Sequence, residues 1–116
     1  MLVNQTKIDK PWGYEQIWAK TDSYVGKIIV INAGHRLSKQ YHIKKIETIY
    51  VLEGVLLNFD ENNKMTTYGP GQALHIKKGQ IHRFGALENR YVKIIEVSTP
   101  ELYDVVRLED DYGRDD

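Results

Sequence analysis

The sequence predicts an all-β domain whose strands are arranged as a sandwich or a barrel. Short runs of β-branched and aromatic residues recur at spacings of roughly 8–12 residues, with turn signals between them. No window carries a sustained apolar period of about 3.6 residues, so long helices are not expected. The 116 residues are expected to form one domain, 1–116, that buries a core without disulfides.

Each expected strand is a short apolar or aromatic run that ends at residues favouring a turn. Typical turns are Gly69-Pro70-Gly71 and Lys77-Lys78-Gly79. The DENN stretch, 60–63, lies between LLNF and MTTY and predicts a hairpin loop. A short helical turn is expected near 100–103. In chain order the expected strands are 14–18 (YEQIW), 24–31 (YVGKIIVI), 48–52 (TIYVL), 55–59 (VLLNF), 73–76 (ALHI), 91–97 (YVKIIEV) and 102–106 (LYDVV).

Composition narrows the setting and the partners. Lysine plus arginine and aspartate plus glutamate each total 16, so the formal net charge is zero. A basic excess is typical of proteins that bind nucleic acid or anionic membranes, and neither partner is expected here. The chain has no cysteine, no secretory signal pattern and no apolar run of about 18 residues that could span a membrane. A cytoplasmic location is therefore expected.

Two stretches of the chain carry spaced polar residues of the kinds that bind metal ions. Gln40, His42 and Glu47 lie between Gly34 and Gly54, and a second glycine-rich stretch ends at His82. Imidazole, carboxylate and amide oxygen suit a divalent first-row metal. The expected metal ligands are therefore Gln40, His42, Glu47 and His82.

The period of a β-strand indicates how these ligands could meet. Gln40 and His42 are two residues apart and point to the same face of a strand. Glu47 follows across the IKKI bend, and His82 starts a strand after the turn at Gly79. If the two stretches are antiparallel neighbours, all four side chains converge and leave open positions for water or substrate oxygens.

The C-terminal residues 108–116 (LEDDYGRDD) are acidic and polar. Composition alone predicts a solvated tail for such a stretch.

The two polar stretches resemble the paired motifs of the cupins. Cupins have a glycine, a His-x-His pair, a glutamate and a second glycine, followed by a glycine-rich stretch that ends in histidine. Here Gln40 stands in place of the first histidine. The resemblance implies a jelly roll, the double-stranded β-helix of two packed antiparallel sheets.

A narrower resemblance covers nearly the whole chain. The sequence is similar to the C-terminal cupin domain of the type II mannose-6-phosphate isomerases, which are bifunctional with mannose-1-phosphate guanylyltransferase. Three segments carry it: PWGYE at 11–15, LSKQYH at 37–42 and VRLEDDYGR at 106–114. The last match implies that the C-terminus is no solvated tail. It implies that Arg107, Glu109, Tyr112 and Arg114 fold back and help to build a site or brace the sheet.

The resemblance implies a metal-dependent aldose–ketose isomerase that acts on a sugar phosphate. The expected cofactor is a divalent metal ion, with zinc as the first choice and manganese, iron, nickel or cobalt as the alternatives. Two residues depart from the family pattern: Lys45 stands where an arginine is usual, and Thr48 where a histidine is usual. Lysine cannot replace arginine in bidentate contacts, so the first departure bears on activity.

Sequence position also gives candidates for the catalytic and substrate contacts. Lys45 and His75 are the expected catalytic residues, and Glu53 is a further candidate for the base. The expected substrate-binding cations are Lys44, Arg83, Arg107 and Arg114.

Two other functions stay open on the same residues. One is a cupin that binds a sugar or another small molecule without catalysis. The other is a different metal-dependent enzyme, such as an iron dioxygenase, against which Gln40 argues because those enzymes favour histidine-rich sets. A homodimer is expected in either case, with the PWGYEQIW segment covering an open sheet edge.

Overall fold

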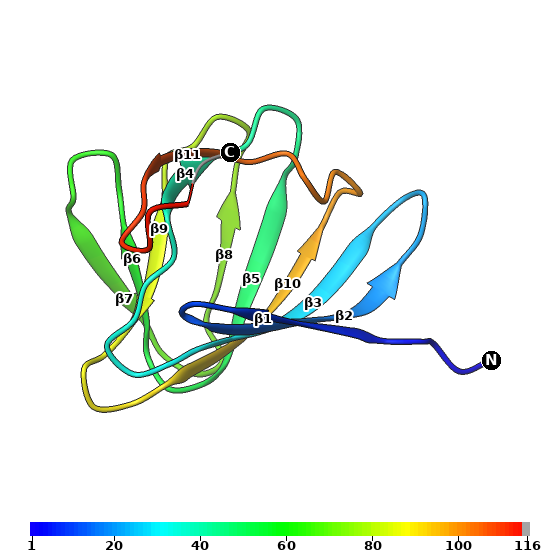
Figure 1. The fold of residues 1–116 in the computed structure, drawn as a ribbon, viewed down its shortest axis with the longest axis horizontal. Coiled ribbons are helices and arrows are strands. Elements are labelled where there is room, and N and C mark those ends of the chain that lie inside the picture. The colour runs from blue at the N-terminus through cyan, green and yellow to red at the C-terminus, as the bar shows by residue number, and fades with distance from the viewer. Residues whose placement is uncertain (115–116) are drawn as a thin grey trace.

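The computed structural model describes residues 1–114, and the regular structure in this range is entirely β (Figure 1). The prediction of an all-β fold is confirmed. No helix in these residues is long and apolar enough to cross a membrane. The strands are β1 (Thr6–Lys10), β2 (Gly13–Lys20), β3 (Val25–Ile31), β4 (Lys39–Tyr41), β5 (Glu47–Glu53), β6 (Leu56–Phe59), β7 (Met65–Tyr68), β8 (Ala73–Ile76), β9 (Arg83–Ala86), β10 (Val92–Ser98) and β11 (Val106–Glu109).

The strands form antiparallel sheets that pack as a jelly roll (Figure 1). A six-stranded sheet has the order β1-β2-β3-β10-β5-β8, and a three-stranded sheet has the order β7-β6-β9. Strands β4 and β11 form a separate two-stranded ribbon. Backbone bridges from Arg36 to Gly85 and from Gln40 to His82 join the 35–41 segment to the β9 segment.

The inward-facing residues of the central strands are apolar at one end of the interior and polar or charged at the other. Strand β10 buries Val92 and Ile94 at one end and Glu96 and Ser98 at the other. In the register, Val92 lies opposite Ile31, whereas Glu96 lies opposite Lys27. The apolar end holds the core, because its side chains lose water contact. The charged end is where a site can form.

Most expected strands are present with small shifts of their ends, and the DENN hairpin is confirmed. The Asp60 carboxylate accepts the N–H groups of Asn62 and Lys64, both at 2.9 Å, and this closes the loop between β6 and β7. The expected strand 102–106 is wrong: β11 begins only at Val106, because the preceding residues form a turn. Near 100–103, where a short helical turn is expected, the chain forms a hydrogen-bonded turn at 102–103 that does not continue into a helix.

The C-terminal segment, 106–114, folds back onto the sheet. Strand β11 pairs with β4, and Tyr112 packs against the core with its hydroxyl 2.7 Å from Nδ1 of His35. The Asp111 carboxylate pairs with Arg36 at 2.6 Å and with Arg83 at 2.9 Å. The solvated-tail interpretation is therefore wrong for these residues. Residues 115–116 of that interpretation lie outside the described part of the chain.

The PWGYEQIW segment does not lie at a sheet edge, contrary to the sequence-based expectation. Strand β1 pairs with β2 from Thr6 to Lys10 and forms the edge itself. The run of residues 6–10 is too short and too polar to stand out in the sequence as a strand.

The turn between β1 and β2 packs tightly against β3. Gly13 has φ of 153°, and a Cβ built on it would lie 2.0 Å from the carbonyl oxygen of Val30. We expect Gly13→Ala to lower the free energy of unfolding by more than about 2 kcal/mol, because the backbone must move. Gly79→Ala is the matched control: φ is 71° there, but a Cβ would meet nothing within 4 Å. The control should cost about 1 kcal/mol in urea unfolding, and equal losses would contradict the packing argument.

Candidate metal centre

Three buried side chains from both halves of the jelly roll meet at the charged end of the interior. His42 follows β4 directly, Glu47 is the first residue of β5, and His82 immediately precedes β9. The backbone of Gln40 exchanges two hydrogen bonds with that of His82, at 3.0 and 2.9 Å, and this pairs the two polar stretches of the sequence. The expected neighbourhood of the two stretches is present.

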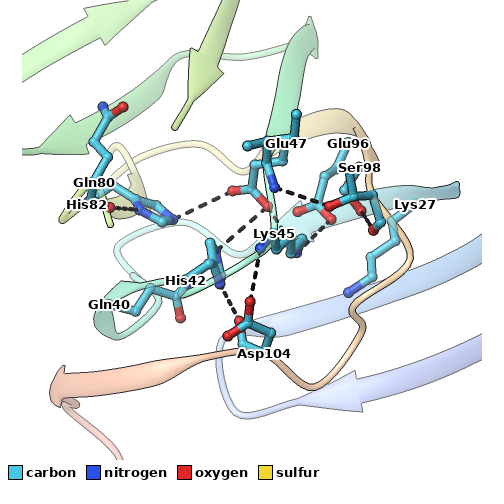
Figure 2. Close-up of polar contacts among 12 residues, drawn as sticks. Lys27, Gln40, His42, Lys45, Glu47, Gln80, His82, Glu96, Ser98 and Asp104 are labelled. Carbon is cyan, nitrogen blue, oxygen red and sulfur yellow. Dashed lines mark hydrogen bonds and ion pairs between the residues drawn. The ribbon is translucent and has the colours of Figure 1, made fainter. Parts of the chain in front are cut away.

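The imidazoles of His42 and His82 point toward the carboxylate of Glu47 (Figure 2). Nε2 of His42 lies 3.8 Å from Oε2 of Glu47, and Nε2 of His82 lies 3.5 Å from Oε1. One ligand atom from each of the three residues falls within 4.8 Å of the others. Two atoms that bind one tetrahedral metal at about 2.0–2.2 Å lie about 3.4 Å apart. The spacing therefore fits a shared metal ion.

Backbone carbonyls fix which nitrogen of each imidazole faces the carboxylate. Nδ1 of His42 donates to the carbonyl of Asp104 at 2.5 Å, and Nδ1 of His82 donates to that of Gln80 at 2.9 Å. With Nδ1 protonated, Nε2 of the neutral ring is the lone-pair nitrogen. Such bonds orient histidines that bind metal.

The donor set itself calls for a cation. Both Nε2 atoms are buried and have no hydrogen-bond partner among the described residues. Neutral imidazoles with protonated Nδ1 present lone pairs to a carboxylate that carries lone pairs of its own. Lys45 reaches the Glu47 carboxylate at 2.9 Å, but the two imidazole lone pairs face no donor. Buried acceptors without donors are costly, and a divalent cation between them removes the cost. The residues present thus fit a metal ion.

Glu47 is held in its ionised form. Burial opposes ionisation, but the positive charge of the Lys45 ammonium beside the carboxylate outweighs burial and holds the pKa of Glu47 well below its usual value. Lys45 Nζ lies 2.9 Å from Oε2 of Glu47. Because a metal ligand must be deprotonated, this environment prepares the carboxylate for a metal ion.

Gln40, the fourth expected ligand, is half-buried on β4 next to this set. It lines the same pocket as His42, and its side-chain oxygen accepts a hydrogen bond from Ser38 at 2.8 Å. An amide oxygen has two lone pairs, so this hydrogen bond leaves one for a metal. Gln40 as a ligand stays a prediction.

A second buried carboxylate shares Lys45 with Glu47. Glu96 Oε2 lies 3.1 Å from Lys45 Nζ (Figure 2). Burial lowers the pKa of Lys45, but Glu96 and Glu47 outweigh burial and raise it above its ordinary value. Burial raises the pKa of Glu96, and the charge of Glu47 adds to this rise against the opposing charges of Lys45 and Lys27. Lys45 is therefore a fixed cation, and Glu96 is the more readily protonated carboxyl group.

Asp104 holds the loop that carries Lys45. Its carboxylate accepts the backbone N–H groups of Ile43, Lys44 and Lys45 at 3.0, 2.6 and 2.9 Å. The N–H of Lys44, with those of its two neighbours, holds the pKa of Asp104 below its usual value. The backbone carbonyl of Asp104 also accepts the hydrogen bond from His42, so this one residue fixes both the conformation of the loop and the orientation of the imidazole.

A pocket of about 100 Å³ opens beside His42. It brings together expected metal, catalytic and substrate-binding residues, namely Gln40, His42, Lys45, Arg107 and Arg114. The Arg114 guanidinium also pairs with Asp110 at 2.9 Å.

Other expected residues lie away from this pocket. His75 lies opposite Thr48, one residue after Glu47 on β5, so the two side chains face away from the metal centre and bond each other at 2.7 Å. Glu53 is at the far end of β5, where it accepts a hydrogen bond from Tyr91. The structure does not bring His75 or Glu53 to the site.

Two of the expected substrate-binding cations have other surroundings. Lys44 is exposed and does not line the pocket. The Arg83 side chain is buried, and it donates to the carbonyl of Leu37 at 2.9 Å and pairs with Asp111 at 2.9 Å. Arg83 therefore braces the C-terminal segment.

Sequence reasoning missed Lys27 and Glu96, although a signal for both was present. Each is a charged residue at a position whose strand neighbours, two residues away, are buried apolar residues: Ile29 beside Lys27 and Ile94 beside Glu96. A charge on the inward face of an otherwise apolar strand indicates a buried polar site.

Comparison with known families decides the relationship. The family described as mannose-6-phosphate isomerase, C-terminal, matches residues 2–110. The chain belongs to this family. Its resemblance to the isomerase-associated cupins is thereby confirmed. A curated relative, quercetin 2,3-dioxygenase from Bacillus subtilis (strain 168), is 29% identical over 83 residues, which are 68% of this chain and 24% of the relative. The chain thus spans about a quarter of that relative's length.

Solved structures share the fold at low sequence identity. KdgF from a Halomonas species has a TM-score of 0.73 at 21% identity, covering 82% of this chain and 87% of that one. A sugar phosphate isomerase of the cupin superfamily from Silicibacter pomeroyi has a TM-score of 0.64 at 17% identity, covering 73% and 59%. The polyketide cyclase RemF from Streptomyces resistomycificus has a TM-score of 0.75 at 20% identity, covering 82% and 70%. These similarities establish the cupin fold. The reaction has to be inferred from the residues of the site.

Proposed function

We propose that this cupin is a metal-dependent aldose–ketose isomerase that acts on a sugar phosphate of the mannose 6-phosphate type. The observation that carries the proposal is the buried His42, Glu47 and His82 set beside a pocket with an excess of cationic side chains. The family match adds support. We propose Gln40 as the fourth metal ligand and zinc as the first metal to test, ahead of manganese, iron, nickel and cobalt.

The metal ion and the chain would have separate tasks. A divalent cation held by this set acts as a Lewis acid that polarises the sugar carbonyl. The chain contributes a pocket whose walls carry the ammonium of Lys45 and the guanidinium of Arg107. Fixed positive charges in a partly dry pocket stabilise negative charge that develops on sugar oxygens.

Isomerisation moves a proton between neighbouring carbons, so the pocket needs a proton acceptor. Glu96 lines the pocket, and its carboxyl group is close to Lys45. We assign the role of general base to the Glu96 carboxylate. Lys45 stays the catalytic cation beside it. This assignment replaces a lysine base, because the raised pKa of Lys45 keeps its amine protonated.

An activity assay with matched variants tests the proposal. Zinc-loaded protein should convert mannose 6-phosphate to fructose 6-phosphate in a coupled assay. We expect Glu96→Gln to lower the rate by roughly 100-fold or more, the usual contribution of general acid–base catalysis. Glu61→Gln, in the exposed hairpin loop, should keep the full rate. With metal content equal in all samples, an active Glu96→Gln variant would refute the assigned base, and an inactive wild type would refute the isomerase.

A metal-dependent oxygenase is the second candidate function. Two imidazoles and one carboxylate also suit non-haem iron, and the curated relative is a dioxygenase. Oxygen uptake by the iron-loaded protein with a small aromatic or sugar substrate, together with no isomerase activity, would favour this candidate. A binding protein without catalysis would show neither reaction. The homodimer and the cytoplasmic location stay predictions.

A further inference from the structure

The turn that joins β1 to β2 forms part of the pocket wall. This turn, Lys10 to Gly13, is the start of the PWGYE segment, and the function proposed above gives it no task. Lys10 and Trp12 both line the pocket that also contains His42. The segment therefore reaches the site as well as supporting the sheet.

The turn is anchored at several points, which fixes the position of Lys10. The Trp12 side chain is 2% exposed and belongs to the core, and its carbonyl accepts the N–H of Asn32 at 2.8 Å. Gly13 is pressed against the backbone of Val30. Because the backbone is already held, binding a ligand here costs no further ordering of the turn.

The charges around the pocket leave Lys10 without a counter-charge. Each acidic residue in the wall already has a partner: Glu15 pairs with Lys27 at 3.5 Å, Glu96 pairs with Lys45, and Asp104 accepts backbone N–H groups. Among residues 1–114, no side-chain hydrogen bond or ion pair reaches Lys10. The side chain of the half-buried Lys10 is thus available to an anionic ligand.

We propose that Lys10 binds the phosphate group of a phosphorylated sugar, so that the Lys10–Gly13 turn is the phosphate subsite of the pocket. The inference deepens the proposed function and rests on it for the sugar. It moves the anion contact away from Lys44, which is exposed, and from Arg83, which is engaged with Asp111. A lysine ammonium suits a phosphate as a compact point charge.

Calorimetric binding to the zinc-loaded full chain tests the subsite, with mannose 6-phosphate and inorganic phosphate as probes. We expect Lys10→Gln to weaken mannose 6-phosphate binding by about tenfold or more, the loss of one hydrogen bond between charged groups. Inorganic phosphate should compete with the sugar phosphate in the wild type and compete less well in the variant. Lys7→Gln is the matched control, because Lys7 is exposed and three residues away on β1, which places it on the opposite face.

The outcomes separate this inference from the proposed function. Lys10-dependent binding of mannose 6-phosphate without turnover would leave the subsite standing while the isomerase fails. Equal affinity in wild type and Lys10→Gln overturns the subsite, as does an equal loss in the Lys7→Gln control. A wild type that binds neither probe overturns it too. Unfolding midpoints of both variants, measured alongside, show whether each is folded.

Discussion

Replacing His82 with glutamine should lower zinc affinity by more than about 100-fold. Loss of an outer partner of a metal ligand already costs about 10–100-fold, and His82 supplies a ligand atom itself. Glu47→Gln should have an effect of the same size, because it removes the only carboxylate of the set and keeps the shape of the side chain. Competitive titration of the metal-free protein against a chelator of known affinity measures both variants.

The control for this prediction is another histidine of the same sheet. His75→Gln changes an imidazole that lies on the outer face, and zinc affinity should stay unchanged. Because His82 is fully buried, His82→Gln needs a check of folding by circular dichroism. If a folded Glu47→Gln variant binds zinc as tightly as the wild type, the metal centre is not where we place it.

Replacing Lys45 with methionine should destabilise the metal-free protein by about 3–5 kcal/mol. The substitution leaves Glu47 and Glu96 buried without their shared cation, and breaking one side of a buried ion pair costs this much. The loss should be smaller when zinc is bound, since the metal ion compensates the charge of Glu47. Urea unfolding of the chelator-treated and zinc-loaded forms, both measured at the same pH, gives the difference.

Lys44→Met provides the comparison for Lys45→Met. Lys44 is the neighbouring residue, it is exposed, and its hydrogen bond to Asp104 is made by the backbone N–H. Its replacement should therefore change stability by less than about 0.5 kcal/mol. An equal loss for Lys45→Met with and without zinc would contradict the idea that Lys45 and the metal ion neutralise the same carboxylate.

The convergence of these three side chains could be predicted because local rules decide their positions. His42 and Glu47 are close in sequence, one just after a short strand and the other at the start of a long one. His82 follows a turn at Gly79, whose φ of 71° favours glycine. Turn chemistry and strand period were enough to bring these side chains together, and the same rules gave the hairpin at 60–63.

The residues that were misplaced depend on register and on distant partners. His75 and Ile76 are neighbours in sequence, but only Ile76 shares the inner face with Glu47, and the sequence does not give the pairing that decides this. Arg83 braces the C-terminal segment because its partner Asp111 comes 28 residues later. Lys10 reaches the pocket through a turn whose anchoring depends on a backbone contact with Val30.

The most direct test of the account is a crystal structure of the zinc-loaded protein with anomalous diffraction recorded at the zinc edge. The account predicts one strong anomalous peak about 2.0–2.2 Å from Nε2 of His42, Nε2 of His82 and a carboxylate oxygen of Glu47, with Gln40 completing the set. A peak at other residues would contradict it. So would electron density in which His42 and His82 bond Glu47 directly with no metal ion between them.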